Sequence, residues 1–204
     1  FARMLRQGAD VRPLVSAGFR LIWVGSVTLA VVIFFARTEL ILLMMPERAS
    51  AYRSDTLGLL FWAFVPVCTI YIFSTLLTAD ERLRAMNRIF VAGIALDIAL
   101  NLFLIPRYQA LGAAAATLCT QTFVALGMMA LCLRYFRLRP SVAGLVRTLA
   151  FAATVGATGV FVFNETSLSW PARSGLVFVV ALGAAFLFRQ VDFRLLRALN
   201  MAKE

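Results

Sequence analysis

An aspartate near the middle of a strongly apolar helix constrains this chain most. The stretch LDIALNLFLIPRYQALGAAAATLCTQT, Leu96–Thr122, carries Asp97 and Asn101 among apolar residues, breaks at Pro106 and restarts at Gly112. A soluble helix would have a continuous polar face, and a simple membrane anchor would have no central acid. Because a carboxyl group in hydrocarbon is costly, it usually marks a functional site. We therefore expect a protein that moves a substrate across a bilayer.

The composition predicts an all-α integral membrane protein. Hydrophobic residues make up 62% of the 204 positions and charged residues only 15%, whereas soluble domains contain about 25% charged residues. The net charge of +10 comes from basic residues at the ends of apolar segments. That placement indicates topology signals and contacts with lipid headgroups, not a nucleic-acid surface.

Nothing in the sequence indicates an enzyme. The chain has no histidine, which is the commonest general base and zinc ligand. Its three cysteines, Cys68, Cys119 and Cys132, lie in apolar segments without metal-ligand spacing. We therefore predict no catalytic residue, no metal site and no cofactor.

Apolar runs predict six transmembrane helices, the first of which could extend toward Met45. A helical span needs about 20 apolar residues, so the last two candidates are short. They are either two thin spans or one re-entrant hairpin. The six segments are Leu21–Ala36, Leu57–Thr78, Ile89–Ile105, Leu111–Leu133, Leu149–Phe163 and Leu176–Phe188.

Charge placement agrees with these six spans. If both ends of the chain are cytoplasmic, 15 of the 20 basic residues fall in inside segments, as the positive-inside rule requires. The expected organisation is a basic cytoplasmic juxtamembrane segment (1–20), a four-helix core (21–133), a basic cytoplasmic loop (134–148), a peripheral two-helix hairpin (149–189) and a cytoplasmic tail (190–204).

The third predicted helix carries the main candidate site. Gly93, Asp97 and Asn101 are spaced four residues apart and so share one helix face. An acid and an amide in line suit a water-accessible groove that binds a proton, a cation or sugar hydroxyls. The alternative is that Asp97 bonds to Asn101 or to a neighbouring helix and only stabilises the bundle.

Further candidates lie on the neighbouring predicted helices. In the fourth, Gly112, Ala116 and Thr120 form a small-residue face for helix packing, while Thr117 and Gln121 are candidates to line a cavity. In the second, Tyr71, Ser74, Thr75 and Thr78 form a polar stripe beside a kink expected at Pro66. This stripe suits a moving gate or ordinary packing equally well, and Pro106 is the second candidate kink.

The order of these features resembles the C-terminal, MATE-like bundle of polysaccharide flippases in the multidrug/oligosaccharidyl-lipid/polysaccharide exporter (MOP) superfamily. The residues that carry the resemblance are ALDIALNLFLIPRYQALGAAAATL, Ala95–Leu118. Asn101, the Leu-Ile-Pro ending at Pro106, Tyr108 and the Gly-Ala-Ala beginning at Gly112 match the family pattern. Asp97 stands where an asparagine is usual, and Gln109 begins the Gln-Ala-Leu that replaces the usual glycine after the tyrosine.

The resemblance implies a function. The six helices would be the last six of fourteen in a bacterial inner-membrane transporter that flips an undecaprenyl-diphosphate-linked oligosaccharide to the outer leaflet, for O-antigen or exopolysaccharide assembly. Alternating access could be coupled to H+ or Na+, and a polysaccharide polymerase and membrane lipids are the expected partners. The alternatives are a cation-coupled multidrug exporter of the same superfamily, a membrane-embedded glycan polymerase or ligase, and a non-transporting assembly subunit.

Overall fold

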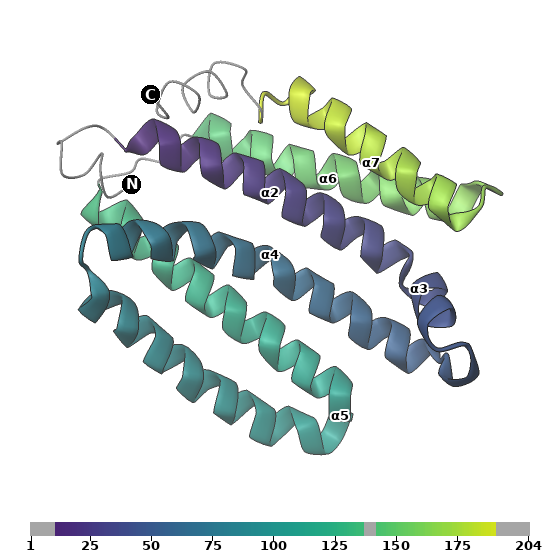
Figure 1. Cartoon of the computed structure of the whole chain (residues 1–204), viewed down its shortest axis with the longest axis horizontal. Coiled ribbons are helices and arrows are strands. Elements are labelled where there is room, and N and C mark those ends of the chain that lie inside the picture. Colours follow the sequence, from purple (N-terminus) through teal and green to yellow (C-terminus); the bar gives the residue numbers. More distant parts are fainter. Residues whose placement is uncertain (1–10, 137–141, 191–204) are drawn as a thin grey trace.

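The computed structural model describes residues 11–136 and 142–190, and the secondary structure of this part of the chain consists of helices joined by short turns (Figure 1). Most of the predicted tail, the first ten residues and part of the predicted loop 134–148 lie outside the described residues. The elements are α2 (Arg12–Phe35), α3 (Arg37–Met44), the short 3-10 helix η1 (Pro46–Arg48), α4 (Ala51–Ala79), α5 (Leu83–Tyr135), α6 (Val142–Glu165) and α7 (Trp170–Leu187).

Five of these helices, α2, α4, α5, α6 and α7, are long and apolar enough to span a membrane. The 53-residue α5 is a hairpin, because its backbone reverses at Gln109 (Figure 1). We call residues 83–108 the first arm and residues 110–135 the second arm. Each arm of about 26 residues is roughly 39 Å long, enough to cross the hydrocarbon core. The chain is a multi-pass membrane protein by these criteria.

The predicted apolar segments fall within helices except for their last residues Ala36 and Phe188, which lie one residue beyond α2 and α7. Two predicted features were wrong. The first helix does not continue to Met45, because α2 ends at Phe35, Ala36 leaves the helical conformation and α3 begins as a separate helix. The break expected at Pro106 lies at Gln109 instead. Proline removes one backbone donor but its fixed φ is compatible with a helix, so the first arm continues past it.

The last two helices form an antiparallel pair. The predicted short segment Leu149–Phe163 is part of α6, which has 24 residues. This helix begins at Val142, so it includes the last part of the predicted loop 134–148. The 18-residue α7 returns along it to the end of the bundle where α2 begins (Figure 1). Both helices pack against α2, and each is long and apolar enough to span a membrane, which favours two spans over a re-entrant hairpin.

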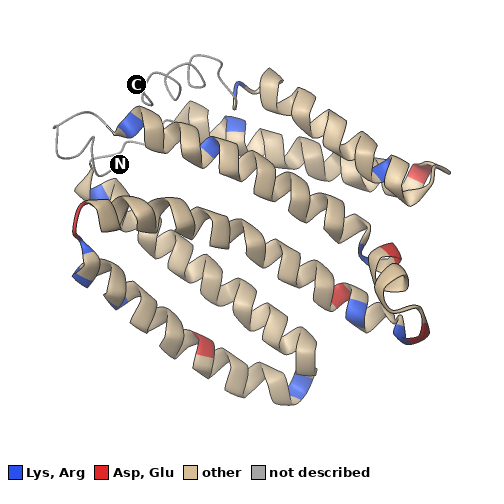
Figure 2. Ribbon diagram, in the orientation of Figure 1, with Lys and Arg blue, Asp and Glu red and all other residues tan. Residues whose placement is uncertain are grey.

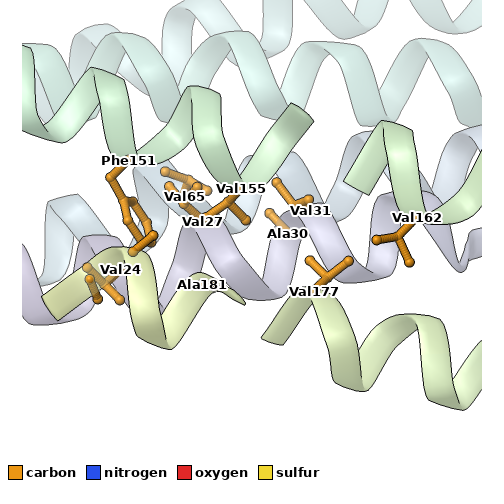
Figure 3. Close-up of a cluster of buried hydrophobic side chains, with 12 residues drawn as sticks. Val24, Val27, Ala30, Val31, Val65, Phe151, Val155, Val162, Val177 and Ala181 are labelled. Carbon is orange, nitrogen blue, oxygen red and sulfur yellow. The ribbon is translucent and has the colours of Figure 1, made fainter. Parts of the chain in front are cut away.

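Two buried clusters hold the bundle together. The first joins α2, α4, α6 and α7, and Figure 3 shows Phe151 of α6 pointing into it, with Val24 of α2 and Val65 of α4 in the same cluster. The second joins the start of α2 to α4 and the second arm of α5, around Leu76, Leu77 and Met128, which are fully buried. The helices α2 and α4 contribute to both clusters and connect them.

Charged side chains gather at the two ends of the bundle (Figure 2). The end where α2 begins and α7 finishes carries more of the described arginines than the opposite end, where α3 and η1 lie. Asp97 is the exception, since it lies well inside the first arm of α5. This distribution separates an apolar zone from two polar ends, as a bilayer requires.

Gln109 adopts a backbone conformation that favours glycine. Its φ of 49° and ψ of −126° lie where side chains with a Cβ are strained. Gln109→Gly is therefore expected to raise the free energy of unfolding by about 1 kcal/mol, measured by reversible unfolding in mixed micelles. Ala110→Gly, at the next position, is the matched control and is expected to lower it. A loss of stability in Gln109→Gly would contradict the strained reversal.

Candidate functional site

Asp97 and Asn101 are bonded to each other on the first arm of α5. The Asn101 side-chain amide donates to Asp97 Oδ2 over 2.9 Å, and both side chains are half-buried. No arginine or lysine of residues 11–136 and 142–190 forms a salt bridge with Asp97. The bond satisfies one carboxylate oxygen and leaves the second for a further interaction.

The two arms of α5 pack closely against each other where glycines leave room, and we call this contact the arm seam. The first arm contributes Ile89, Gly93 and Leu104, and the second arm contributes Gly112, Thr120, Val124 and Gly127. A Cβ on Gly93 would lie 2.5 Å from Val124 Cγ2, and one on Gly127 would lie 3.0 Å from Ile89 Cγ2. Asp97 is one helical turn beyond Gly93, so it lies on the seam side of the first arm.

The arm seam contains one buried polar group without a hydrogen-bond partner among the described residues, the Thr120 hydroxyl. The Thr120 methyl group is 4.0 Å from the Cβ position of Gly93. Ala116 is fully buried on the same arm, while the predicted cavity residues Thr117 and Gln121 are half-buried. The described contacts join neither of these two to Asp97.

The polar stripe of α4 bonds mainly to its own helix. Tyr71 is 70% exposed, and its backbone carbonyl accepts from the hydroxyls of Ser74 at 3.2 Å and Thr75 at 2.7 Å. The Thr78 hydroxyl contacts Met86 Sδ at the start of α5. These local bonds fit the packing alternative, although Tyr71, Thr75 and Thr78 are exposed. Pro66 lies inside α4, which continues from Ala51 to Ala79.

Tyr52 is a residue that sequence reasoning missed. From the first turn of α4, its hydroxyl donates to the Tyr108 carbonyl over 2.8 Å and accepts from the Leu111 N–H over 3.1 Å. These two backbone groups flank Gln109, so one phenol binds both sides of the α5 reversal. The bond spans 56 residues of sequence, and no local pattern signals it.

Two arginines at the end of the bundle where Tyr52 lies, Arg37 and Arg53, contact other residues of this chain. Arg37 Nε pairs with Asp55 at 3.2 Å, and the Arg37 guanidinium lies 4.5 Å from the centre of the Phe34 ring. Arg53 donates to the Arg48 carbonyl over 2.6 Å. The ion pair joins α3 to α4, in keeping with the interfacial role expected of such arginines.

The described residues offer no grouping of His, Cys, Asp and Glu that could hold a metal ion. The arrangement is instead a hydrogen-bonded carboxylate and amide beside a close contact between two membrane-length helices. Such a pair can accept a proton or a cation at its remaining oxygen, or bind hydroxyl groups. The chain matches no protein-family model, no curated protein and no solved structure.

Proposed function

We propose that this chain is part of a polysaccharide flippase that moves an undecaprenyl-diphosphate-linked oligosaccharide from the inner to the outer leaflet of the bacterial cytoplasmic membrane. The proposal rests on the sequence resemblance and on one structural observation, a carboxyl group inside a membrane-length helix whose second oxygen is not used by the bond to Asn101; the bond by itself would fit the stabilising alternative equally well. Six membrane crossings would then form part of a bundle that rocks against a second bundle around a central cavity.

The Asp97–Asn101 pair supports a transport role because a carboxyl group at this depth destabilises membrane insertion by about 2.5–3.5 kcal/mol. The Asn101 amide donates a hydrogen bond to only one of the two Asp97 carboxylate oxygens. In the proposed mechanism the other oxygen takes up a proton or Na+, or accepts a sugar hydroxyl, as the cavity opens to one side. Binding of either ion changes the charge of the site and so favours one of the two conformations.

The same carboxylate favours a second candidate, a cation-coupled multidrug exporter. An asparagine could bind sugar hydroxyls as well as an aspartate does, whereas only the carboxyl group can carry a proton. If the chain is an exporter, deleting the gene would lower resistance to cationic drugs and leave the surface glycan unchanged. If it is a flippase, the deletion would reduce the surface glycan and leave drug resistance unchanged.

The test replaces Asp97 in the chromosomal gene. Asp97→Ala and Asp97→Asn are each expected to reduce surface glycan at least tenfold, because both remove the ionisable group. Glycan is measured by antibody or lectin binding to intact cells, at equal amounts of membrane-inserted protein. Asp97→Asn keeps an acceptor for the Asn101 amide, so it separates loss of charge from loss of the bond.

Thr122→Val is the matched control on the second arm, since among residues 11–136 and 142–190 the Thr122 hydroxyl bonds only to the Leu118 carbonyl of its own helix. It is expected to leave glycan export unchanged. Normal export in both Asp97 variants would exclude the proposed role. Export retained by Asp97→Asn alone would exclude the ion-carrying role and leave Asp97 a hydrogen-bonding role, toward Asn101 or toward a sugar hydroxyl.

A further inference from the structure

The hairpin tip of α5 leaves backbone groups that its own helices cannot satisfy. The last carbonyls of a helix and its first N–H groups have no partners within the helix. The Tyr108 carbonyl ends the first arm, and the Leu111 N–H lies in the first turn of the second arm. At a reversal made by one non-helical residue there is no loop to provide partners for either group.

Tyr52 provides both partners from a different helix. Its hydroxyl is donor to Tyr108 and acceptor from Leu111, which uses the phenol in both directions at once. Because Tyr52 lies in the first turn of α4, these bonds fix the tip of α5 to the end of α4 that faces α3 and η1 (Figure 1).

The opposite end of α4 is also fixed to α5. The turn between the two helices holds Arg82, which pairs with Asp80 at 2.9 Å and lies 4.5 Å from the centre of the Tyr135 ring at the end of the second arm. Between the ends, Cys132 contacts the Phe73 carbonyl in the buried cluster. Tyr52 is the described attachment that lies at the reversal itself.

We propose that Tyr52 is a latch that joins α4 and both arms of α5 into one unit, so that these three membrane-length segments move together in any conformational change. The inference stands on the two hydrogen bonds and the position of Gln109. It does not depend on the substrate or on the proposed function.

The test is amide hydrogen exchange of Tyr52→Phe in the full chain, reconstituted in lipid nanodiscs. This variant keeps the ring and removes only the hydroxyl. Exchange at the Leu111 amide is expected to become about tenfold faster, as loss of its one hydrogen bond to Tyr52 implies, while exchange in α6 and α7 stays unchanged. Tyr108→Phe is the matched control, because Tyr108 contributes its carbonyl and not its hydroxyl to the latch.

A distance measurement checks the consequence for motion. Spin labels at Ala51, at the start of α4, and at Ala110, at the start of the second arm, are expected to show one narrow distance distribution that broadens in Tyr52→Phe. Native exchange at Leu111 with an unbroadened distribution would overturn the latch. Equal acceleration by Tyr52→Phe and Tyr108→Phe would also overturn it, because the effect would then not depend on the two bonds of the Tyr52 hydroxyl. Should Tyr52→Phe not fold, the pair Gln109→Gly and Gln109→Gly/Tyr52→Phe gives the same comparison with a less strained tip.

Discussion

Gly112→Ala is expected to lower the free energy of unfolding by about 3 kcal/mol, because the added methyl group would collide with the backbone of the first arm. A Cβ on Gly112 would touch the Leu104 carbonyl oxygen and lie 2.7 Å from its carbon and 3.2 Å from the Ile105 nitrogen. Backbone atoms cannot rotate away as a side chain can. The two arms would have to separate, which would also weaken the contacts of Gly93 and Gly127.

Gly156→Ala is the matched control for this substitution. Gly156 lies inside α6, and nothing is within 4 Å of the position that its Cβ would occupy. Since alanine favours a helix over glycine by up to about 1 kcal/mol, this variant is expected to be as stable as the parent or slightly more so. Reversible unfolding of both variants measures the difference, and equal stability of the two would exclude the close contact at Leu104.

Phe151→Ala is expected to cost about 2 kcal/mol of unfolding free energy. Phe151 is fully buried in the cluster between α2, α4, α6 and α7 (Figure 3). A helix that is separated in the bilayer still has an apolar environment, so only lost packing contacts and the cavity contribute, and the cost falls below that in a soluble protein. Reversible unfolding, followed by the separation of α6 from α2, measures this cost.

Phe161→Ala provides the comparison on the same helix. The Phe161 side chain is 64% exposed on the bundle surface, so its removal leaves no cavity and is expected to change stability by less than about 0.5 kcal/mol. If Phe161→Ala were the more destabilising of the two, α6 would pack through a different face from the one described.

The apolar runs were sufficient to predict where the helices lie, because hydrocarbon-length segments are determined by composition alone. They could not predict where the helices begin. The α2 helix starts at Arg12, next to Pro13, and α4 starts after Ser50, whose side chain accepts from the Arg53 N–H. These signals are short and polar, and they fall outside the apolar segments that the prediction used.

The candidate site was predictable only in its local part. The spacing of Asp97 and Asn101 predicted a shared face, and the 2.9 Å bond between them confirms that they meet. The role of Tyr52 could not be predicted, because its partners are more than 50 residues away and are backbone atoms. The position of the reversal was also missed, since the proline at 106 is a stronger sequence signal than the glutamine at 109.

The one-residue reversal at Gln109 makes α5 intolerant of changes in length. A hairpin with a long loop absorbs an inserted or deleted residue, whereas here the helix on each side begins at once. One extra residue would rotate the second arm by about 100° about its axis relative to the first. Gly112, Thr120 and Gly127 would all leave the arm seam together. We therefore expect variants of this chain to accept substitutions at the tip far more readily than insertions or deletions.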